Sequence, residues 1–328
     1  SEEVFNGMGF NWKNIIWTDE FTGLNHPTGQ PIYIHRDIEI AASQGNNDNP
    51  QTSAPGGTSE KMIRTPADKT VYIGNKFETD INTYLVADYK TGEILAGKNI
   101  DDARPMASFA KVMTAYELMK EGVSLSRSST YDPIDHKSLY PTFRITTGEK
   151  ILNKNLMYSG LVSSLNTPMK MLVDSVEEKE SKFIERMNIQ AQNWSLDKTS
   201  FTDVTGEDLG NKTSARDYLS LYTKATKNIE TSEFLSTKSY EYNEMVDKDG
   251  NPRHYDDNSN LLFKKDNLSF NILNSKTGYL DEAGAGLAMT IENKTNNKKF
   301  VIITMGNPDY TNRFNEPERL AEWTINNF

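Results

Sequence analysis

The chain has 328 residues, which exceeds the usual size of one domain and allows a large buried core. Its net charge of −10, from 36 Lys and Arg against 46 Asp and Glu, argues against a nucleic-acid partner, which would require a basic surface. The lack of cysteine excludes disulfides, thiol nucleophiles and thiolate metal sites. No apolar stretch reaches the roughly 18 residues of a membrane span, so membrane association is not evident.

Residues 1–60 are predicted to form an N-terminal aromatic arm and a linker. Aromatic side chains recur over residues 1–42 without a helical or strand period. Residues 43–59 are rich in Gly, Pro, Asn and Ser, which is typical of a linker. The arm either packs on the main domain or docks on a partner. No signal peptide is evident, although a mature chain that begins at Ser1 would look the same.

The remaining residues, 61–328, have two strand-rich ends and a helical middle. Apolar runs bounded by turn residues predict strands, and apolar side chains repeating every three or four positions predict helices. The expected strands are 83–89, 93–97, 271–275, 286–291 and 300–305. The expected helices are 106–120, 153–161, 167–176, 182–192, 214–225 and 316–328.

These elements predict an α/β (α+β) fold. Strands from both ends of the chain pair into one antiparallel sheet of about five strands, with helices covering it. Residues of about 123–260 are expected to form a helical subdomain inserted after the first helix. The four histidines lack ligand spacing, so no metal site is predicted.

The helix of residues 106–120 places a serine where a lysine can activate it. Ser108 and Lys111 are three residues apart and share one helix face. The helix is apolar over most of its circumference, and burial disfavours the charged form of a lysine. A neutral Lys111 can accept the proton of Ser108 and make it a nucleophile. The alternative is a cap serine and a solvated lysine, because S-x-x-K also occurs at 195–198.

Two further motifs follow in the chain. Ser164-Leu165-Asn166 fits S-x-N, and Lys276-Thr277-Gly278 is K-T-G. Together with S-x-x-K they form a set found in penicillin-binding proteins and class A β-lactamases. Each motif alone is weak, since S-x-N recurs at 269–271 and K-T-G at 90–92. The copy at 90–92 lies in a predicted hairpin turn, whereas 276–278 ends a predicted strand.

The chain resembles the D-alanyl-D-alanine carboxypeptidases of the low-molecular-mass penicillin-binding proteins, over residues of about 70–328. Residues 104–115 look like the family's R-x-P-A-S-x-T-K-x-M-T-A, residues 161–166 like its L-x-x-S-G-N, and residues 276–284 like its K-T-G-x-T-x-E-A-G. The chain departs from the family at Ala110, Leu165 and 167–168, where Thr, Gly and Asp-Ala are more usual. The resemblance implies a β-lactamase/transpeptidase-like fold.

The resemblance also implies the catalytic residues. Ser108 is the nucleophile that the substrate acylates, and Lys111 is its base. Ser164 relays a proton, and Asn166 holds the peptide amide. The reaction would need no metal or cofactor.

The implied substrate-binding residues surround the terminal carboxylate of the substrate. Lys276 supplies a positive charge, Thr277 a hydroxyl donor and Arg313 a further carboxylate partner. Gly278 belongs to the same motif, and the backbone N–H of Tyr279 joins that of Ser108 in an oxyanion hole. The implied substrate is the D-Ala-D-Ala end of a peptidoglycan stem peptide, with β-lactams as covalent inhibitors. The enzyme would then act outside the cytoplasm, as a secreted, periplasmic or wall-associated protein.

Three other functions remain open on the sequence. A DD-endopeptidase that cuts peptide cross-links would carry the same motifs. A β-lactamase would share the fold, but no glutamate-containing deacylation motif of the class A kind is evident between Asn166 and Lys276. A non-catalytic wall-binding protein would use the aromatic arm for docking, and the intact motifs argue against it.

Overall fold

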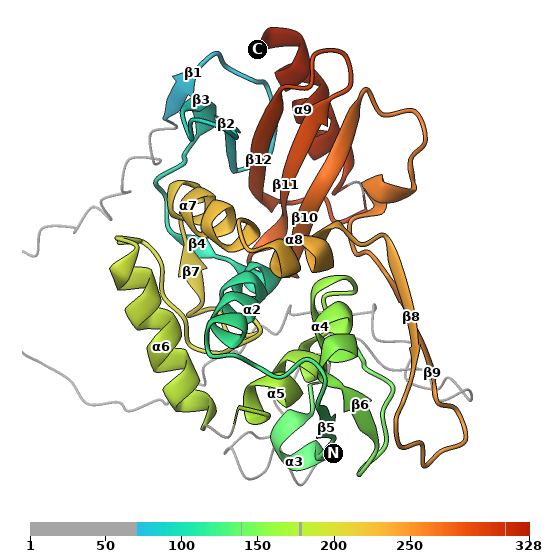
Figure 1. Ribbon diagram of the computed structural model, residues 1–328. Helices are drawn as coiled ribbons and strands as arrows, with labels where there is room; N and C mark the ends of the chain where they lie inside the picture. Colours follow the sequence, from blue (N-terminus) through green and yellow to red (C-terminus); the bar gives the residue numbers. More distant parts are fainter. Residues whose placement is uncertain (1–70, 139, 177–178, 312) are drawn as a thin grey trace, which may run out of the picture. The chain divides into compact units, whose positions relative to one another are not determined.

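The computed structural model describes residues 71–328 except 139, 177–178 and 312 (Figure 1). The predicted arm and linker of residues 1–60 therefore lie outside the described residues. The described strands are β1 (Tyr72–Gly74), β2 (Thr83–Asp88), β3 (Ile94–Lys98), β4 (Arg104–Pro105), β5 (Ser128–Thr130), β6 (Lys150–Leu152), β7 (Lys212–Thr213), β8 (Ser239–Asn243), β9 (Arg253–Asp257), β10 (Phe270–Leu280), β11 (Gly284–Asn293) and β12 (Lys299–Asn307). The described helices are η3 (Ala107–Phe109), α2 (Ala110–Lys120), α3 (Pro133–His136), α4 (Asn153–Leu161), α5 (Asn166–Asp174), α6 (Glu180–Asn193), α7 (Ala215–Thr226), α8 (Ile229–Ser236), η4 (Leu261–Lys264) and α9 (Asn315–Asn327).

Strands from the two ends of the described chain form one sheet. Its order is β1-β3-β2-β12-β11-β10, and every pair in it is antiparallel. The join between the two ends is the pairing of β2 with β12, from Asp88 opposite Phe300 to Thr83 opposite Met305 (Figure 1). The predicted antiparallel sheet is confirmed, with the short edge strand β1 as a sixth member.

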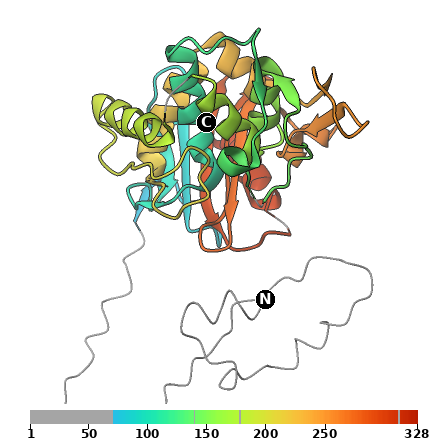
Figure 2. The same ribbon diagram turned by 90° about the horizontal axis from the view of Figure 1, so that it is seen from below.

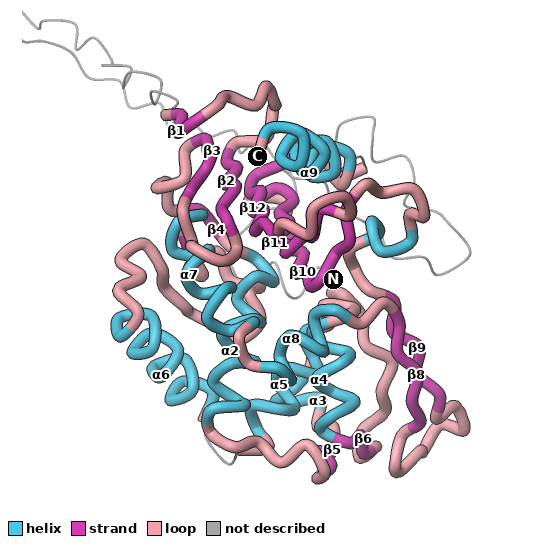
Figure 3. Tube along the Cα trace, turned by 45° about the horizontal axis from the view of Figure 1, so that its top comes forward, coloured by secondary structure: helices cyan, strands magenta, loops and turns pink. Residues whose placement is uncertain are grey.

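Both faces of the sheet are buried. Along β12, Val301 and Ile303 pack into the core that includes α2 and α7, while Phe300 and Ile302 pack into the core that includes α9. Figure 3 shows α9 on one side of the sheet and α2, α4, α5, α6 and α7 on the opposite side. Because successive strand residues point to opposite faces, a strand buried on both sides has a continuous apolar run. Each such side chain contributes about 1.5–3 kcal/mol when fully buried.

Helix α2 is the buried centre of the helical part. It packs against α4, α5, α6 and α7, and most of its residues are buried. Ahead of it, Phe109 stacks on Tyr218 of α7 with 4.4 Å between ring centroids. A polar side chain on this helix, such as that of Lys111, is therefore removed from water.

The structure adds one feature to the sequence expectations and corrects another. The region of about 123–260 contains the strand pairs β5–β6 and β8–β9 besides its helices. The β8–β9 hairpin extends away from the sheet (Figures 1 and 2). In addition, Lys276–Gly278 does not end a strand: β10 continues to Leu280, and the chain turns only at 281–283. Among the described residues, no helix combines the length and apolar character needed to cross a bilayer.

Candidate active site

Ser108 and Lys111 form a hydrogen-bonded pair at the start of α2. Ser108 lies in the 3₁₀ turn η3, and Lys111 is the second residue of α2. Lys111 Nζ donates to Ser108 Oγ at 2.7 Å and to the carbonyl oxygen of Thr205 at 2.8 Å. The structure therefore brings the predicted nucleophile and base within the distance that proton transfer requires.

The charge state of Lys111 is set mainly by burial. Its side chain is fully buried, and this desolvation lowers its pKa from 10.5 to about 7. The charges of Asp203 and Glu207 act in the opposite direction, while Lys170 lowers the pKa further. Near neutral pH a substantial fraction of Lys111 is thus a neutral amine, the form that accepts the proton of Ser108.

A second hydroxyl–lysine pair lies beside the first. Lys276, in the middle of β10, donates to Ser164 Oγ at 2.6 Å and to the carbonyl oxygen of Thr277 at 3.0 Å. Burial, assisted by the charge of Lys111, lowers the pKa of Lys276 well below its usual value. Ser164 adopts a left-handed backbone conformation with φ of 63°. Ser164 is hydrogen-bonded to Lys276, so the structure links the S-x-N and K-T-G motifs.

Asn166, the first residue of α5, is held by the loop that precedes β6. Its Nδ2 donates to the carbonyl oxygen of Tyr140 at 2.8 Å and to Ser138 Oγ at 3.2 Å. Its Oδ1 is buried and has no hydrogen-bond partner among the described residues. Asn166 lines the same cleft as Ser108, and an amide oxygen is an acceptor, which suits contact with a peptide N–H.

The predicted site residues converge on one cleft of about 370 Å³. Thr277 Oγ1 is 2.7 Å from Ser259 Oγ on its wall. The guanidinium of Arg313 stacks on the ring of Tyr310, 3.9 Å from its centroid, and donates to the Tyr310 carbonyl. Predicted residues that line the cleft are Ser108, Ser164, Asn166, Thr277, Gly278, Tyr279 and Arg313, while Lys111 and Lys276 are buried behind it.

Glycines allow β10 and a nearby loop to approach the serine closely. Gly278 and Gly286 face each other across β10 and β11, and a Cβ on either would lie 3.0 Å from a neighbouring atom of Met106 or Phe109. Gly206 has φ of +89°, and a Cβ there would lie 1.9 Å from the Ala107 carbonyl oxygen. Side chains at these positions would push the turn that carries the serine out of the cleft.

A family comparison agrees with this geometry. Residues 70–309 match the model of the D-alanyl-D-alanine carboxypeptidases, peptidase family S11. The chain belongs to this family. The match covers the sheet, the helical part and all three motifs, so the family predicted from the sequence is confirmed.

The relatives of this chain include proteins named carboxypeptidase and proteins named endopeptidase. D-alanyl-D-alanine carboxypeptidase DacA of Haemophilus influenzae is 27% identical over 267 residues, which cover 75% of this chain and 62% of that protein. D-alanyl-D-alanine endopeptidase of Escherichia coli is 28% identical over 244 residues, covering 73% and 75%. The crystal structure of penicillin-binding protein 5 from Haemophilus influenzae has a TM-score of 0.66 and 25% identity, covering 76% and 72%. The chain thus spans less than two thirds of the length of this DacA relative. The likeness to the crystal structure of the penicillin-binding protein confirms the predicted fold.

Sequence reasoning did not identify several residues of the cleft. Tyr140, Glu207 and Tyr310 line it, and Ser138 bonds to Asn166 beneath it. None of these residues stands at a motif spacing from Ser108, so the sequence offered no signal for them. By contrast, the alternative copies of the motifs are exposed: Ser195 and Lys198 lie on the surface, as does Lys90.

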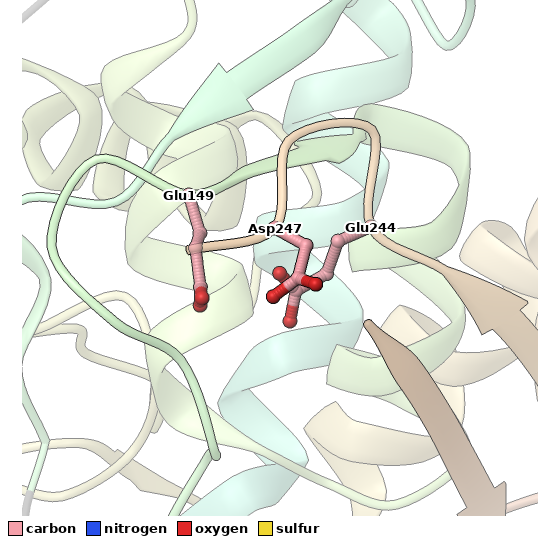
Figure 4. Close-up of side chains that lie close together, drawn as sticks. All are labelled: Glu149, Glu244 and Asp247. Carbon is pink, nitrogen blue, oxygen red and sulfur yellow. The ribbon is translucent and has the colours of Figure 1, made fainter. Parts of the chain in front are cut away.

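One acidic cluster of the described residues has the composition of a metal site. Glu149, Glu244 and Asp247 each place a carboxylate oxygen within 4.8 Å of the others (Figure 4). Burial, together with Glu149, raises the pKa of Glu244 to about 7. Protein groups already bind the cluster: His254 Nε2 is 2.7 Å from Glu244 Oε1, and the guanidinium of Arg144 is 3.6 Å from the same oxygen. The cluster joins the loop of the β8–β9 hairpin to β6 and does not line the cleft.

Proposed function

We propose that the chain is a serine-type D-Ala-D-Ala carboxypeptidase, which removes the terminal D-alanine from peptidoglycan stem peptides. The observation that carries this proposal is the hydrogen bond between Ser108 and a fully buried Lys111 at the base of the cleft. Membership of the D-alanyl-D-alanine carboxypeptidase family supports the same reaction. Such a substrate exists outside the cytoplasm, which is where the enzyme would act.

The reaction proceeds in two steps. In the first step, neutral Lys111 takes the proton of Ser108, and Ser108 Oγ attacks the carbonyl carbon of the scissile bond. The backbone N–H groups of Ser108 and Tyr279 stabilise the developing oxyanion. The leaving D-alanine nitrogen receives a proton, which Lys111 or Ser164 supplies. In the second step, water hydrolyses the ester on Ser108 and restores the hydroxyl.

The carboxylate of the substrate binds at the β10 side of the cleft. Lys276, Thr277 and Arg313 supply one or two positive charges and a hydroxyl donor there. Burial lowers the pKa of Lys276, whereas a carboxylate bound beside it would favour its ammonium form. A β-lactam offers a strained amide beside a carboxylate and would acylate Ser108 in the same way.

A DD-endopeptidase is the second candidate, because the relative from Escherichia coli has that name and matches the chain equally well. A β-lactamase differs by fast hydrolysis of its acyl-enzyme, which turnover of bound penicillin would reveal. A non-catalytic wall-binding protein would bind peptidoglycan without labelling of Ser108.

The proposed reaction is tested by following free D-alanine. The protein is incubated with a peptide ending in D-Ala-D-Ala in the presence of a chelator, and we expect D-alanine to be released in proportion to time and enzyme. Release that requires added zinc contradicts the serine mechanism. Cleavage confined to cross-linked peptide dimers favours the endopeptidase.

Arg313→Gln is expected to weaken recognition of the terminal carboxylate. The substitution removes the charge and keeps an amide that can still lie against Tyr310. The KM for D-Ala-D-Ala peptides should rise by about tenfold, as loss of one charge-assisted hydrogen bond predicts, while kcat changes little. Arg319→Gln, which removes an exposed arginine of α9, serves as the control. An unchanged KM for Arg313→Gln would show that this arginine only packs against the tyrosine.

A further inference from the structure

Glu207 connects the two halves of the candidate catalytic site. It follows Gly206 in the loop before β7 and lines the cleft together with Ser108 and Asn166. Its Oε1 accepts from Ser138 Oγ at 2.5 Å, and its Oε2 accepts from Thr205 Oγ1 at 3.1 Å.

Each of these two partners touches a site residue. The carbonyl oxygen of Thr205 accepts from Lys111 Nζ at 2.8 Å, and Ser138 Oγ accepts from Asn166 Nδ2 at 3.2 Å. One carboxylate therefore has one oxygen directed to the segment that holds Lys111 and the other directed to the group that holds Asn166. This bridge is formed by residues far apart in the sequence, from 138 to 207.

Lys170 forms an ion pair with the same carboxylate. Its Nζ lies 3.3 Å from Glu207 Oε2, with 19% of the lysine side chain and 34% of the glutamate side chain exposed. Lys170 is four residues after Asn166 on α5, so both side chains leave the same face of that helix. Helix α5 thus supplies Asn166 and the counter-charge of the glutamate that supports it.

We propose that Glu207, paired with Lys170, is a positioning residue of this site, which fixes the hydrogen-bond partners of Lys111 and Asn166 and sets the charge balance around Lys111. The inference rests on the proposed function and assigns to that site a carboxylate that none of the three motifs contains. It does not make Glu207 the base itself, because both of its oxygens are occupied by Ser138, Thr205 and Lys170.

The charged groups around Lys111 determine in which direction each substitution should shift its pKa. Asp203 and Glu207 raise its pKa, Lys170 lowers it, and Lys276 on β10 is a second buried lysine beside it. Asp203 is committed to the loop, since it accepts from the backbone N–H groups of 205, 206 and 208. Glu180 of α6 acts on Lys170 and Asp203. We therefore alter the charges around Lys111 at Glu207 and Lys170, because substitution of Asp203 would also remove the hydrogen bonds that hold its loop.

The two members of the pair should shift the pH profile of acylation in opposite directions. Loss of the negative charge in Glu207→Gln removes an influence that favours the ammonium form of Lys111, so its neutral form persists to lower pH. Loss of the positive charge in Lys170→Met has the reverse effect. With rates normalised to the plateau near pH 9, we expect the acidic limb to move down by about 0.5–1 pH unit in Glu207→Gln and up by a similar amount in Lys170→Met.

The experiment measures the second-order rate of labelling of the full chain by a fluorescent penicillin between about pH 5.5 and 9.5. Glu207→Ala, which also removes the bridge, should lower the plateau by about tenfold, and Glu207→Gln should restore most of it. Glu241→Gln, which breaks the exposed ion pair with Arg253 on the β8–β9 hairpin, should leave the profile unchanged. Thermal melting identifies variants that fail to fold.

Acidic limbs that coincide in all variants, or that move in the same direction in Glu207→Gln and Lys170→Met, would overturn the inference. A purely structural role of Glu207 predicts coinciding acidic limbs, because it lowers the rate of labelling equally at every pH. If the wild-type chain is not labelled at any pH, the proposed function fails and the inference fails with it. Labelling of the wild type with unmoved limbs refutes the inference alone.

Discussion

Ser108→Ala is expected to abolish covalent labelling by fluorescent penicillin and the release of D-alanine, while the protein remains folded. Ser108 Oγ is the hydroxyl that receives the hydrogen bond of Lys111 and lines the cleft. Without it, the hydroxyl that the proposed base contacts is gone, so the acyl-enzyme cannot form by the proposed route. The substitution removes one half-buried oxygen, and Lys111 keeps its hydrogen bond to the Thr205 carbonyl. The stability cost should therefore be about 1 kcal/mol.

The matched control for this result is Ser195→Ala. Ser195 heads the second S-x-x-K stretch, and both Ser195 and Lys198 are exposed. We expect this variant to be labelled at the wild-type rate. Peptide mapping of the labelled wild-type chain should place the adduct on Ser108. An adduct on another residue, Ser164 included, or D-alanine release that persists in Ser108→Ala, would refute the mechanism.

The sheet could be predicted because its strands are buried on both faces. Residues 300–303 of β12 are all apolar and buried, and Met305 is buried as well. An apolar run of this length between turn residues is typical of a strand buried on both faces. The predicted strands 286–291 and 300–305 are separated by a stretch rich in Asn and Lys, and in the structure β11 ends at Asn293 and β12 begins at Lys299. In these segments the apolar pattern and the turn residues indicate the same strand limits, so the local sequence is sufficient to predict them.

The β8–β9 hairpin could not be predicted, because most of its buried positions are polar. Along β9 the inward residues are His254 and Asp256, and along β8 the inward residue is Tyr242. Ser159, from the distant helix α4, bonds to both Tyr242 and Asp256, while Glu244 in the loop of the hairpin bonds to His254. A strand that buries hydrogen-bonded polar groups has no hydrophobic alternation for the sequence to display.

The candidate site likewise has residues that could be predicted from the sequence and contacts that could not. The three motifs could be predicted because their residue types and spacing are fixed by local chemistry, and the structure brings Ser108, Ser164 and Thr277 into one cleft. The supporting contacts could not be predicted. Glu207 reaches Ser138 across 69 positions, and no property of either residue in the sequence indicates that partner.

Lys111→Ala is expected to slow acylation by a factor on the order of 10² to 10⁴, the usual loss when a general base is removed. The pH profile should change with it. Because burial lowers the pKa of Lys111 to about 7, its proton-accepting form is lost as the pH falls through that value, and the wild-type rate should decline below about pH 7. In Lys111→Ala the remaining slow reaction should lose this decline.

Two variants separate this role from a general effect of removing lysines. Lys198→Ala, in the exposed S-x-x-K stretch, should keep the wild-type rate and profile. Lys276→Ala should chiefly raise the KM of carboxylate-bearing substrates, because its hydrogen bonds go to Ser164 and Thr277 rather than to Ser108. Near-wild-type acylation by Lys111→Ala between about pH 6 and 9 would mean that another group removes the proton of Ser108. Ser164, which lines the same cleft and is hydrogen-bonded to Lys276, would then be the candidate to test by substitution.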